Sequence, residues 1–314
     1  MVELVAIINS FNRLHLLRDA VASLCKALRQ VPSKTAVIVF EAGSTDGSAE
    51  WLAQFAVDNP EVDLRVIEAK PAEASSFSAG ENAACALALK LYPTCRWFFL
   101  FETDNWLASA EPILKAIEFL ERRPDVAAAG FTVRKHSGQP AGFGCRLPTV
   151  WQFLVGPHIT CWLRLESPRQ KELPLCDVVY TSPLLVRCTA WEQSGGFDAD
   201  RFPFSDCDLD WAWRLRKMGW RMAVIQTNAV VHDNRESLSQ WSSSRVLHFH
   251  RSRLKLLERH QGAWVRLFKP LLLLRHCIEW FVLWLSSWPQ RNRADSLDKR
   301  ASLIKTVLNS YEQV

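Results

Sequence analysis

Trp97-Phe98-Phe99-Leu100-Phe101-Glu102-Thr103-Asp104-Asn105 is the stretch that decides the fold, because an unbroken apolar run ends in two carboxylates. Five bulky apolar residues in a row are typical of a strand buried on both faces, as in a parallel sheet covered by helices. Glu102 and Asp104 then lie at the carboxyl end of that strand, which is the edge where open α/β sheets bind ligands. A hard divalent cation bridging a diphosphate needs such oxygen ligands. On this stretch alone, an ordinary strand followed by a polar turn is the simpler interpretation.

The composition is that of a folded globular protein. With 314 residues, of which 48% are hydrophobic, the chain can bury a core and form one large α/β domain or two modest ones. Its formal net charge of +5 is too weak to favour a nucleic-acid partner, but it suits anionic substrates or an acidic membrane surface.

The N-terminus and the cysteines indicate the compartment. Residues 2–8 are too short for a charged-then-apolar leader and contain Glu3, so we expect a cytoplasmic protein. The nine cysteines are an odd number with no Cys-x-x-Cys pair, which predicts neither a disulfide framework nor a thiolate zinc site. We expect most of them to be reduced, buried, small apolar residues.

Strand and helix patterns alternate regularly over more than 130 residues. Strands are expected at residues 4–8, 35–40, 64–67, 97–101 and 126–133, and helices at 14–29, after 48, at 83–91 and at 110–122. This order predicts a doubly wound, mainly parallel sheet flanked by helices. We expect this α/β domain to span residues 1–240 and a basic, amphipathic helical region to span 241–314.

Polar residues follow the first two expected strands. Glu41 ends the second strand and could accept hydrogen bonds from a ribose or a base, whereas Ser44, Thr45 and Asp46 are ordinary residues at a helix N-terminus. Small residues at 79–80 would allow a ligand to approach closely, although a tightly packed helix would use them as well.

Two further residues could carry chemistry. Ser205 and Asp208 match a capping box, and a carboxylate in the first turn of a helix is also stabilised in its ionised form, so Asp208 could serve as a base. His232 follows an apolar segment much as Asp104 does, which favours metal contact, although a lone histidine is more often structural.

The C-terminal region changes in character from about residue 240. Residues 267–288 are mostly apolar but interrupted by charges such as Lys269, Arg275 and Glu279, which argues against a membrane-spanning helix. An interfacial segment at an anionic membrane surface, with Trp280, Trp284 and Trp288 at the headgroup level, fits the pattern. A helical hairpin packed on the catalytic domain or on the partner in a homo-oligomer fits equally well.

Taken together, the motifs resemble family 2 glycosyltransferases of the GT-A fold, in particular the bacterial rhamnosyltransferase-like branch. The resemblance covers roughly residues 4–260 and rests on the order and spacing of several motifs. These are Ile8-Asn9-Ser10-Phe11-Asn12-Arg13, Glu41-Ala42-Gly43-Ser44-Thr45-Asp46-Gly47-Ser48, Ala79-Gly80-Glu81-Asn82, Glu102-Thr103-Asp104, Gly195-Gly196-Phe197-Asp198, Asp208-Leu209-Asp210, Arg214-Leu215-Arg216, His232 and Arg251-Ser252-Arg253.

The resemblance implies a role for each matching position. Asp208 would be the catalytic base, and Asp104 with His232 would bind Mg²⁺ or Mn²⁺. The donor nucleotide-sugar would be bound by Asn9, Phe11, Arg13, Glu41, Ser44, Asp46, Asn82, Glu102 and Gly196. Three positions depart from the family pattern: Glu41 and Glu102 replace aspartates, and Cys207 replaces a glutamate.

The function that this resemblance implies is metal-dependent, inverting transfer of a hexosyl or deoxyhexosyl group. The donor would be a dTDP- or UDP-linked sugar, and the acceptor a hydroxyl of a glycan or lipid-linked molecule in surface polysaccharide or lipopolysaccharide assembly. The protein would then work at the inner face of the cytoplasmic membrane. Two alternatives remain: a nucleotidyltransferase, which would carry a glycine-rich loop that residues 9–13 lack, and a non-catalytic sugar- or nucleotide-binding protein that retains the fold.

Overall fold

The computed structural model describes residues 1–69, 76–142, 144–162, 175–233, 242–285 and 293–309. The chain forms two compact units, which we call the sheet unit (Met1–Arg146 and Gln170–Asn234) and the helical unit (Leu147–Arg169 and Arg235–Val314). The helical unit therefore takes in residues 147–162, which we expected in the α/β domain.

The main sheet of the sheet unit has, among the described residues, eight strands in the order β10-β13-β6-β12-β4-β1-β2-β3. Their bounds are β1 (Val2–Ser10), β2 (Lys34–Glu41), β3 (Leu64–Glu68), β4 (Trp97–Leu100), β6 (Val126–Phe131), β10 (Leu175–Cys176), β12 (Leu184–Arg187) and β13 (Arg221–Ile225). β1, β2, β3 and β4 run parallel, as do β6 and β13, whereas β12 is antiparallel to both β4 and β6. The predicted mainly parallel sheet is confirmed.

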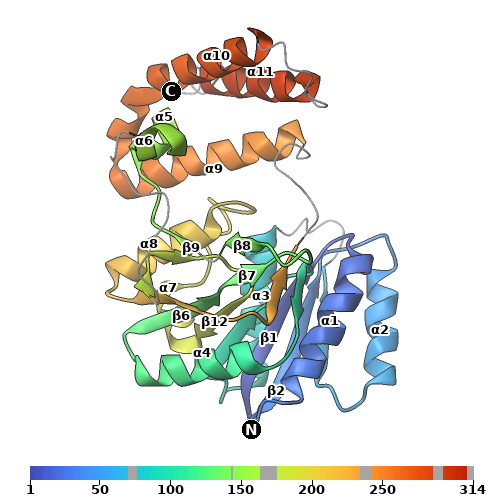
Figure 1. The fold of residues 1–314 in the computed structure, drawn as a ribbon. Helices are drawn as coiled ribbons and strands as arrows, with labels where there is room; N and C mark the ends of the chain where they lie inside the picture. The colour runs from blue at the N-terminus through green and yellow to red at the C-terminus, as the bar shows by residue number, and fades with distance from the viewer. Residues whose placement is uncertain (70–75, 143, 163–174, 234–241, 286–292, 310–314) are drawn as a thin grey trace. The chain divides into compact units, whose positions relative to one another are not determined.

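Helices cover both faces of this sheet (Figure 1). Leu4, Ala6 and Ile8 of β1 pack in one core cluster with residues of α1, α2 and α4, while α3, α7 and α8 contact the sheet elsewhere. All of residues 4–8 are fully buried, as expected for a strand covered on both sides. The helix bounds are α1 (Leu14–Leu28), α2 (Ser48–Asp58), α3 (Phe77–Leu91), α4 (Glu111–Arg122), α7 (Cys188–Ser194) and α8 (Cys207–Lys217).

A smaller sheet lies beyond the carboxyl end of β4. It has the order β5-β14-β7-β8, with β5 (Asn105–Leu107), β7 (Val133–Arg134), β8 (Pro140–Gly142) and β14 (Val230–His232). A further pair joins β9 (Gly144–Cys145) to β11 (Val178–Val179). Because β5 and β14 are antiparallel, His232 is paired with Asn105, next to Asp104.

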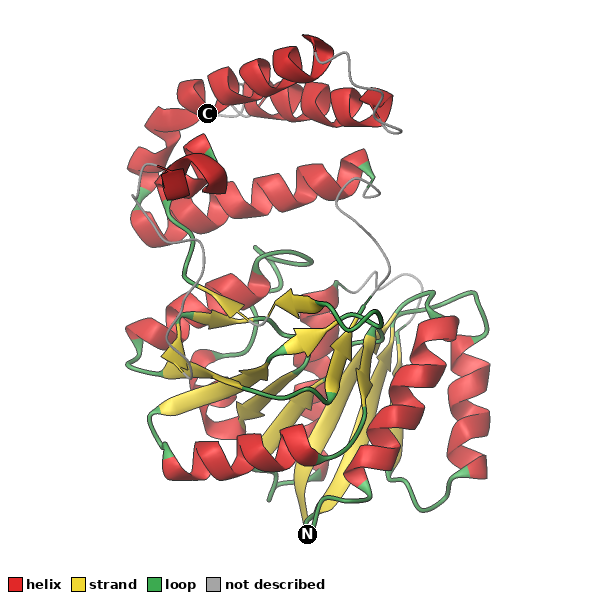
Figure 2. Ribbon diagram, in the orientation of Figure 1, coloured by secondary structure: helices red, strands yellow, loops and turns green. Residues whose placement is uncertain are grey.

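The helical unit is drawn with its helices in red in Figure 2. It consists of α5 (Val150–Val155), α6 (Pro157–Trp162), α9 (Ser243–Gln261), the 3₁₀ helix η2 (Ala263–Phe268), α10 (Lys269–Leu285) and α11 (Arg293–Asn309). α10 and α11 pack as a hairpin, and α11 also contacts α9. Within the described part of the chain, no helix combines the length and the apolar character needed to cross a bilayer.

The cysteines whose side chains the structure describes are free thiols. The buried ones are Cys25, Cys85, Cys95, Cys176, Cys188 and Cys207, whereas Cys277 is exposed.

Candidate active site

Asp104 is the carboxylate around which the site is built. Its side chain is 5% exposed, its Oδ2 lies 3.5 Å from Nη1 of Arg13, and its Oδ1 lies 3.4 Å from Nδ1 of His232. Arg13 comes from the turn after β1 and His232 from the end of β14, so three separate segments converge at the carboxyl edge of the sheet.

Asp104 and His232 fit a divalent cation. Oδ1 of Asp104 is buried and has no hydrogen-bond partner among the described residues. Nδ1 of His232 lies 3.0 Å from Oδ1 of Asn105, and in the tautomer that donates to this oxygen Nε2 has a lone pair for a cation. No group of three or more His, Cys, Asp or Glu in the described ranges could enclose a metal alone. A cation here would take further ligands from substrate oxygens and water, as Mg²⁺ commonly does.

Glu102 is half-buried beside this pair. Oγ1 of Thr181 donates a hydrogen bond to its Oε1 at 3.2 Å. Desolvation and the negative charge of Asp104 raise the pKa of Glu102 to about 8, against the opposing effects of Thr181 and Arg13, and the charge of Asp208 contributes to the increase. Asp208 is therefore close enough to influence the ionisation of Glu102. A bound cation would favour the ionised form of this carboxyl.

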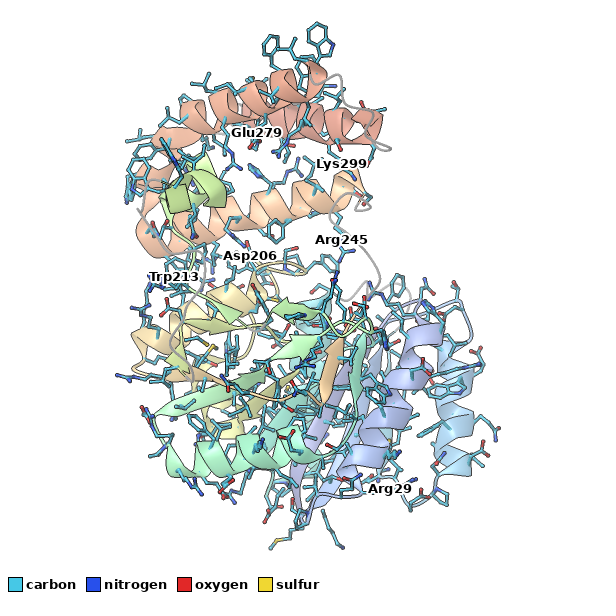
Figure 3. The ribbon with its side chains drawn as sticks, viewed as in Figure 1. Arg29, Asp206, Trp213, Arg245, Glu279 and Lys299 are labelled. Carbon is cyan, nitrogen blue, oxygen red and sulfur yellow. The ribbon has the colours of Figure 1, made fainter. Side chains whose placement is uncertain are left out.

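Asp208 lies half-buried in the first turn of α8. The helix begins after Asp206, labelled in Figure 3, which has a φ of 61° and makes no capping hydrogen bond through its side chain. The predicted capping box of Ser205 and Asp208 is therefore wrong, because the left-handed Asp206 takes the cap position. Asp208 Oδ1 instead accepts a hydrogen bond from the N–H of Leu209 at 2.9 Å.

Asp210 has a structural role in the same helix. Its side chain is fully buried and lies 2.8 Å from Nε of Arg214. The Arg214 guanidinium also donates hydrogen bonds to the carbonyl oxygens of Ser194 and Gly196. This network fixes the turn before α8 and leaves Asp210 unsuited to act as a base.

Asn82 and Gly196 hold that turn from the other side. The Asn82 amide accepts from the N–H of Phe197 at 2.9 Å and donates to its carbonyl oxygen at 2.8 Å. Gly196 has a φ of 66°, and a Cβ there would lie 2.6 Å from Oδ1 of Asn82. The two residues expected to bind the donor thus support the backbone of the site.

Glu41 folds back on its own loop. It is buried, and its carboxylate accepts hydrogen bonds from the N–H groups of Gly43 and Ser44, both at 3.0 Å, and from the Ser44 hydroxyl. Oγ of Ser44 in turn accepts from the N–H of Asn12 at 2.8 Å, which ties this loop to the one after β1.

Asp46 joins the same two loops. Its Oδ2 accepts from the N–H of Leu14 at 2.8 Å, and its Oδ1 accepts from the Ser48 hydroxyl at 2.6 Å. Desolvation opposes ionisation, but the hydrogen bonds from Ser48 and Leu14 prevail and lower the pKa of Asp46 below its ordinary value. A charged Asp46 therefore braces the first turns of α1 and α2.

The close approach expected at residues 79–80 involves protein atoms. A Cβ on Gly80 would lie 2.4 Å from Nδ2 of Asn9 and 2.8 Å from Cδ1 of Phe40. Asn9 also donates to the carbonyl oxygen of Phe77 at 2.9 Å, whereas Phe11 is 56% exposed. The glycine thus lets α3 pack tightly on β1 and β2.

A sequence profile described as glycosyltransferase-like family 2 matches residues 3–266, which is most of the chain. The chain belongs to this family. Two curated relatives, both N-acetylglucosaminyl-diphospho-decaprenol L-rhamnosyltransferases from strains of Mycobacterium tuberculosis, are 27% identical over 179 residues. The match spans 51% of this chain and 58% of those relatives.

Solved structures support the fold of this family 2 chain. The mannosyltransferase PcManGT from Pyrobaculum calidifontis, in complex with GDP-Man and Mn²⁺, has a TM-score of 0.58 at 15% identity and covers 99% of this chain and 88% of its own. Residues 1–349 of S. aureus TarS give a TM-score of 0.52 at 12% identity, covering 99% and 91% respectively. The expected GT-A fold is confirmed.

Sequence reasoning missed one carboxyl of this family 2 site. Glu81 of α3 is 1% exposed, and neither of its carboxylate oxygens has a hydrogen-bond partner in the described parts of the chain. Burial, together with the negative charge of Glu102, raises the pKa of Glu81 well above its ordinary value. The burial of Glu81 was not predictable from the sequence, because a glutamate between Gly80 and Asn82 is expected to be exposed.

We expect Glu81→Gln to stabilise the protein at pH 8 by at least about 1 kcal/mol, and to have little effect on stability at pH 4. A raised pKa in the folded state makes the wild-type carboxyl cost stability as the pH rises above about 4.5, its ordinary value, and glutamine mimics the protonated form. Melting temperatures at both pH values check this, with Glu50→Gln on the exposed part of α2 as the control. Equal melting of the wild type and Glu81→Gln at pH 8 would contradict it.

Proposed function

We propose that this protein is a metal-dependent, inverting glycosyltransferase that moves a sugar from a nucleotide-diphospho-sugar to a hydroxyl of a lipid-linked or glycan acceptor. The observation that carries the proposal is the convergence of Asp104, Glu102 and Asp208 at the carboxyl edge of a family 2 sheet. The names of the curated relatives, which are rhamnosyltransferases with a diphospho-decaprenol acceptor, favour a deoxyhexose donor and a lipid-linked acceptor. The motif resemblance implies that the donor sugar is dTDP- or UDP-linked.

Asp104 and His232 would hold the cation, Mg²⁺ or Mn²⁺. When bound, such an ion supplies positive charge to the diphosphate leaving group. Arg13, whose Nη1 is 3.5 Å from Asp104, would add a fixed positive charge on the same side. The Mn²⁺ in the PcManGT complex supports this choice of ion.

Asp208 would accept the proton of the acceptor hydroxyl as that oxygen attacks the anomeric carbon. Its position in the first turn of α8 favours the ionised state. Cys207 beside it is buried, and burial with the charge of Asp208 raises the pKa of its thiol well above the ordinary value. The cysteine therefore stays neutral and adds no second charge next to the base.

A transfer assay separates this proposal from its alternatives. A panel of nucleotide-sugars with Mn²⁺ and a lipid-linked acceptor should yield glycosylated acceptor and nucleoside diphosphate. A nucleotidyltransferase would instead release diphosphate from a nucleoside triphosphate and a sugar phosphate. A non-catalytic protein would bind nucleotide-sugars without turnover.

We expect Asp104→Ala to abolish Mn²⁺-dependent donor binding while the fold persists, because the residue follows a strand and lies outside its core. Calorimetric titration with UDP- and dTDP-sugars, with and without Mn²⁺, measures this. Asp19→Ala, on the exposed part of α1, removes the same charge away from the site and should bind normally. Unchanged donor affinity in Asp104→Ala would exclude this residue from the site.

We expect Asp208→Asn to cost at most about 1 kcal/mol of stability, because asparagine keeps the local hydrogen bond and loses only the charge–dipole attraction. Asparagine cannot take a proton, so transfer should fall by about 10²-fold or more while donor binding persists. Asp210→Asn is the contrasting variant: weakening its buried pair with Arg214 should cost about 3 kcal/mol. Near-normal turnover in Asp208→Asn would remove this residue as the base.

We further propose that α10 lies on an anionic membrane surface. Its outward residues Leu271, Leu274, Ile278, Phe281 and Leu285 are each about half exposed and follow one another at helical spacing. The helical unit also carries sixteen Lys and Arg against seven Asp and Glu, a net charge of +9, so the remainder of the chain is net −4. An apolar stripe on a cationic unit suits the interface of an acidic bilayer at the inner face of the cytoplasmic membrane.

We expect the full chain to bind liposomes that contain phosphatidylglycerol, and the double variant Leu274→Glu with Ile278→Glu to bind at least about tenfold more weakly. High salt should weaken binding only in part, because apolar burial is not screened. Val57→Glu, at an exposed apolar position of α2, should bind like the wild type. If the wild type does not bind liposomes, is a dimer in light scattering, and becomes a monomer in the double variant, the stripe is an oligomer interface and the membrane proposal is wrong.

A further inference from the structure

The helical unit contains a cavity of about 670 Å³. Its walls come from α5, α9, α10 and α11, and all of its lining residues belong to this one unit. Figure 3 shows Lys299 on α11 and Glu279 on α10 facing the same interior. The proposed transfer chemistry of the sheet unit uses none of these residues.

Four cationic side chains line the cavity: Arg253, Arg275, Lys299 and Arg300. Glu279 pairs with Arg275 at 3.0 Å and with Arg300 at 2.5 Å, and Asp295 pairs with Lys299 at 2.6 Å. The described residues that line the cavity include these four cations and no carboxylate, so the wall itself is positively charged. Lys299 is only 8% exposed, which makes part of this charge desolvated and strengthens its attraction for an anion.

Two histidines in the wall offer unused polar atoms. His276 is 2% exposed, and its Nε2 has no hydrogen-bond partner among the residues that the structure describes, as is true of Nε2 of His250. Their rings lie 5.0 Å apart between centroids. Desolvation and the neighbouring positive charges lower the pKa of His250 to about 3, so this ring is a neutral donor or acceptor at pH 7. Such buried, unsatisfied atoms are costly unless a ligand or water meets them.

Apart from Gln152 and Ser296, the rest of the lining is apolar. Phe153, Phe249, Leu283 and Leu303 line the cavity together with the cations. Phe249 also lies under the Arg253 guanidinium, 5.1 Å from it. A ligand that satisfies both parts of this surface needs an anionic head and an apolar chain.

We propose that the cavity between α5, α9, α10 and α11 binds the phosphate or diphosphate head group and the first apolar segment of an isoprenoid-type lipid. The cations would meet the phosphate oxygens, and the phenylalanines and leucines would cover the chain. Binding of such a lipid needs no sugar transfer. Only the further step, that the lipid is the carrier of the acceptor, rests on the proposed function.

Calorimetry with three probes tests the proposal on the full chain without any nucleotide-sugar. The probes are farnesyl diphosphate, inorganic diphosphate and farnesol, each below its aggregation limit. Farnesyl diphosphate should bind at least about tenfold more tightly than either of the others, since only it has both the head group and the chain. An excess of UDP with Mn²⁺ should not displace it, because the nucleotide would occupy the sheet unit.

Matched variants locate the site. Arg253→Gln should weaken farnesyl diphosphate binding about tenfold. Lys255→Gln removes the same charge from an exposed position of the same helix and should bind like the wild type. Ser296→Trp should block the cavity, of which Ser296 is a wall, and provides a second measurement if Arg253→Gln unfolds.

The possible outcomes are distinct. Inorganic diphosphate or farnesol binding as tightly as farnesyl diphosphate would overturn the lipid assignment, and unchanged affinity in both Arg253→Gln and Ser296→Trp would overturn the location. Cavity-dependent binding in a protein that transfers no sugar would uphold this inference while removing the proposed function. If both variants transfer sugar with an unchanged acceptor KM and bind farnesyl diphosphate like the wild type, the proposed function stands and this inference is overturned.

Discussion

The buried charge of Asp104 is the constraint on which the site depends. A carboxylate at the end of a buried strand loses most of its hydration, and desolvation together with the charge of Asp104 raises the pKa of the neighbouring Glu102 to about 8. Arg13 offsets part of this cost from the turn after β1, and His232 approaches from β14. The parallel register of β1 with β4 and the pairing of β5 with β14 set these distances. A cation bound at this edge of the sheet would neutralise the negative charge of these two carboxyl groups.

The main elements of the fold were predictable from the sequence because their signals are physical and local. The apolar run before Glu102 is buried on both sides in β4, and the expected helix at 110–122 is observed as Glu111–Arg122. The antiparallel direction of β12 was not predictable, since a short strand with three apolar residues has the same pattern in either direction. Nor was it predictable that residues 147–162 belong to the helical unit, because that division depends on long-range packing.

The hydrogen bonds that the side chains of the polar motifs make were not predictable from the sequence. Glu41, Asp46 and Asn82 were all expected to bind the donor, yet their side chains hydrogen-bond mainly to backbone groups of their own loops or of the turn at Phe197. A residue type at the end of a strand does not reveal which way its side chain turns. A longer side chain such as Glu41 can reach back to its own loop, and only the conformation shows that it does. Glu81 escaped notice for a related reason, since burial of a charge-bearing residue goes against its ordinary preference.

α10 has its polar and apolar faces reversed with respect to a helix on the surface of a soluble domain. Arg275, His276 and Glu279 turn toward α11 and the cavity, while Leu274 and Ile278 on the opposite side are exposed. Burying these ion pairs between α10 and α11 costs desolvation free energy that apolar packing would avoid. Binding of an anionic ligand by the cations would offset that cost. A lipid surface would cover the outward leucines, and a lipid phosphate would use the inward cations. One amphiphilic environment would then cover both faces, and the +9 charge of the helical unit would attract the protein to an acidic bilayer.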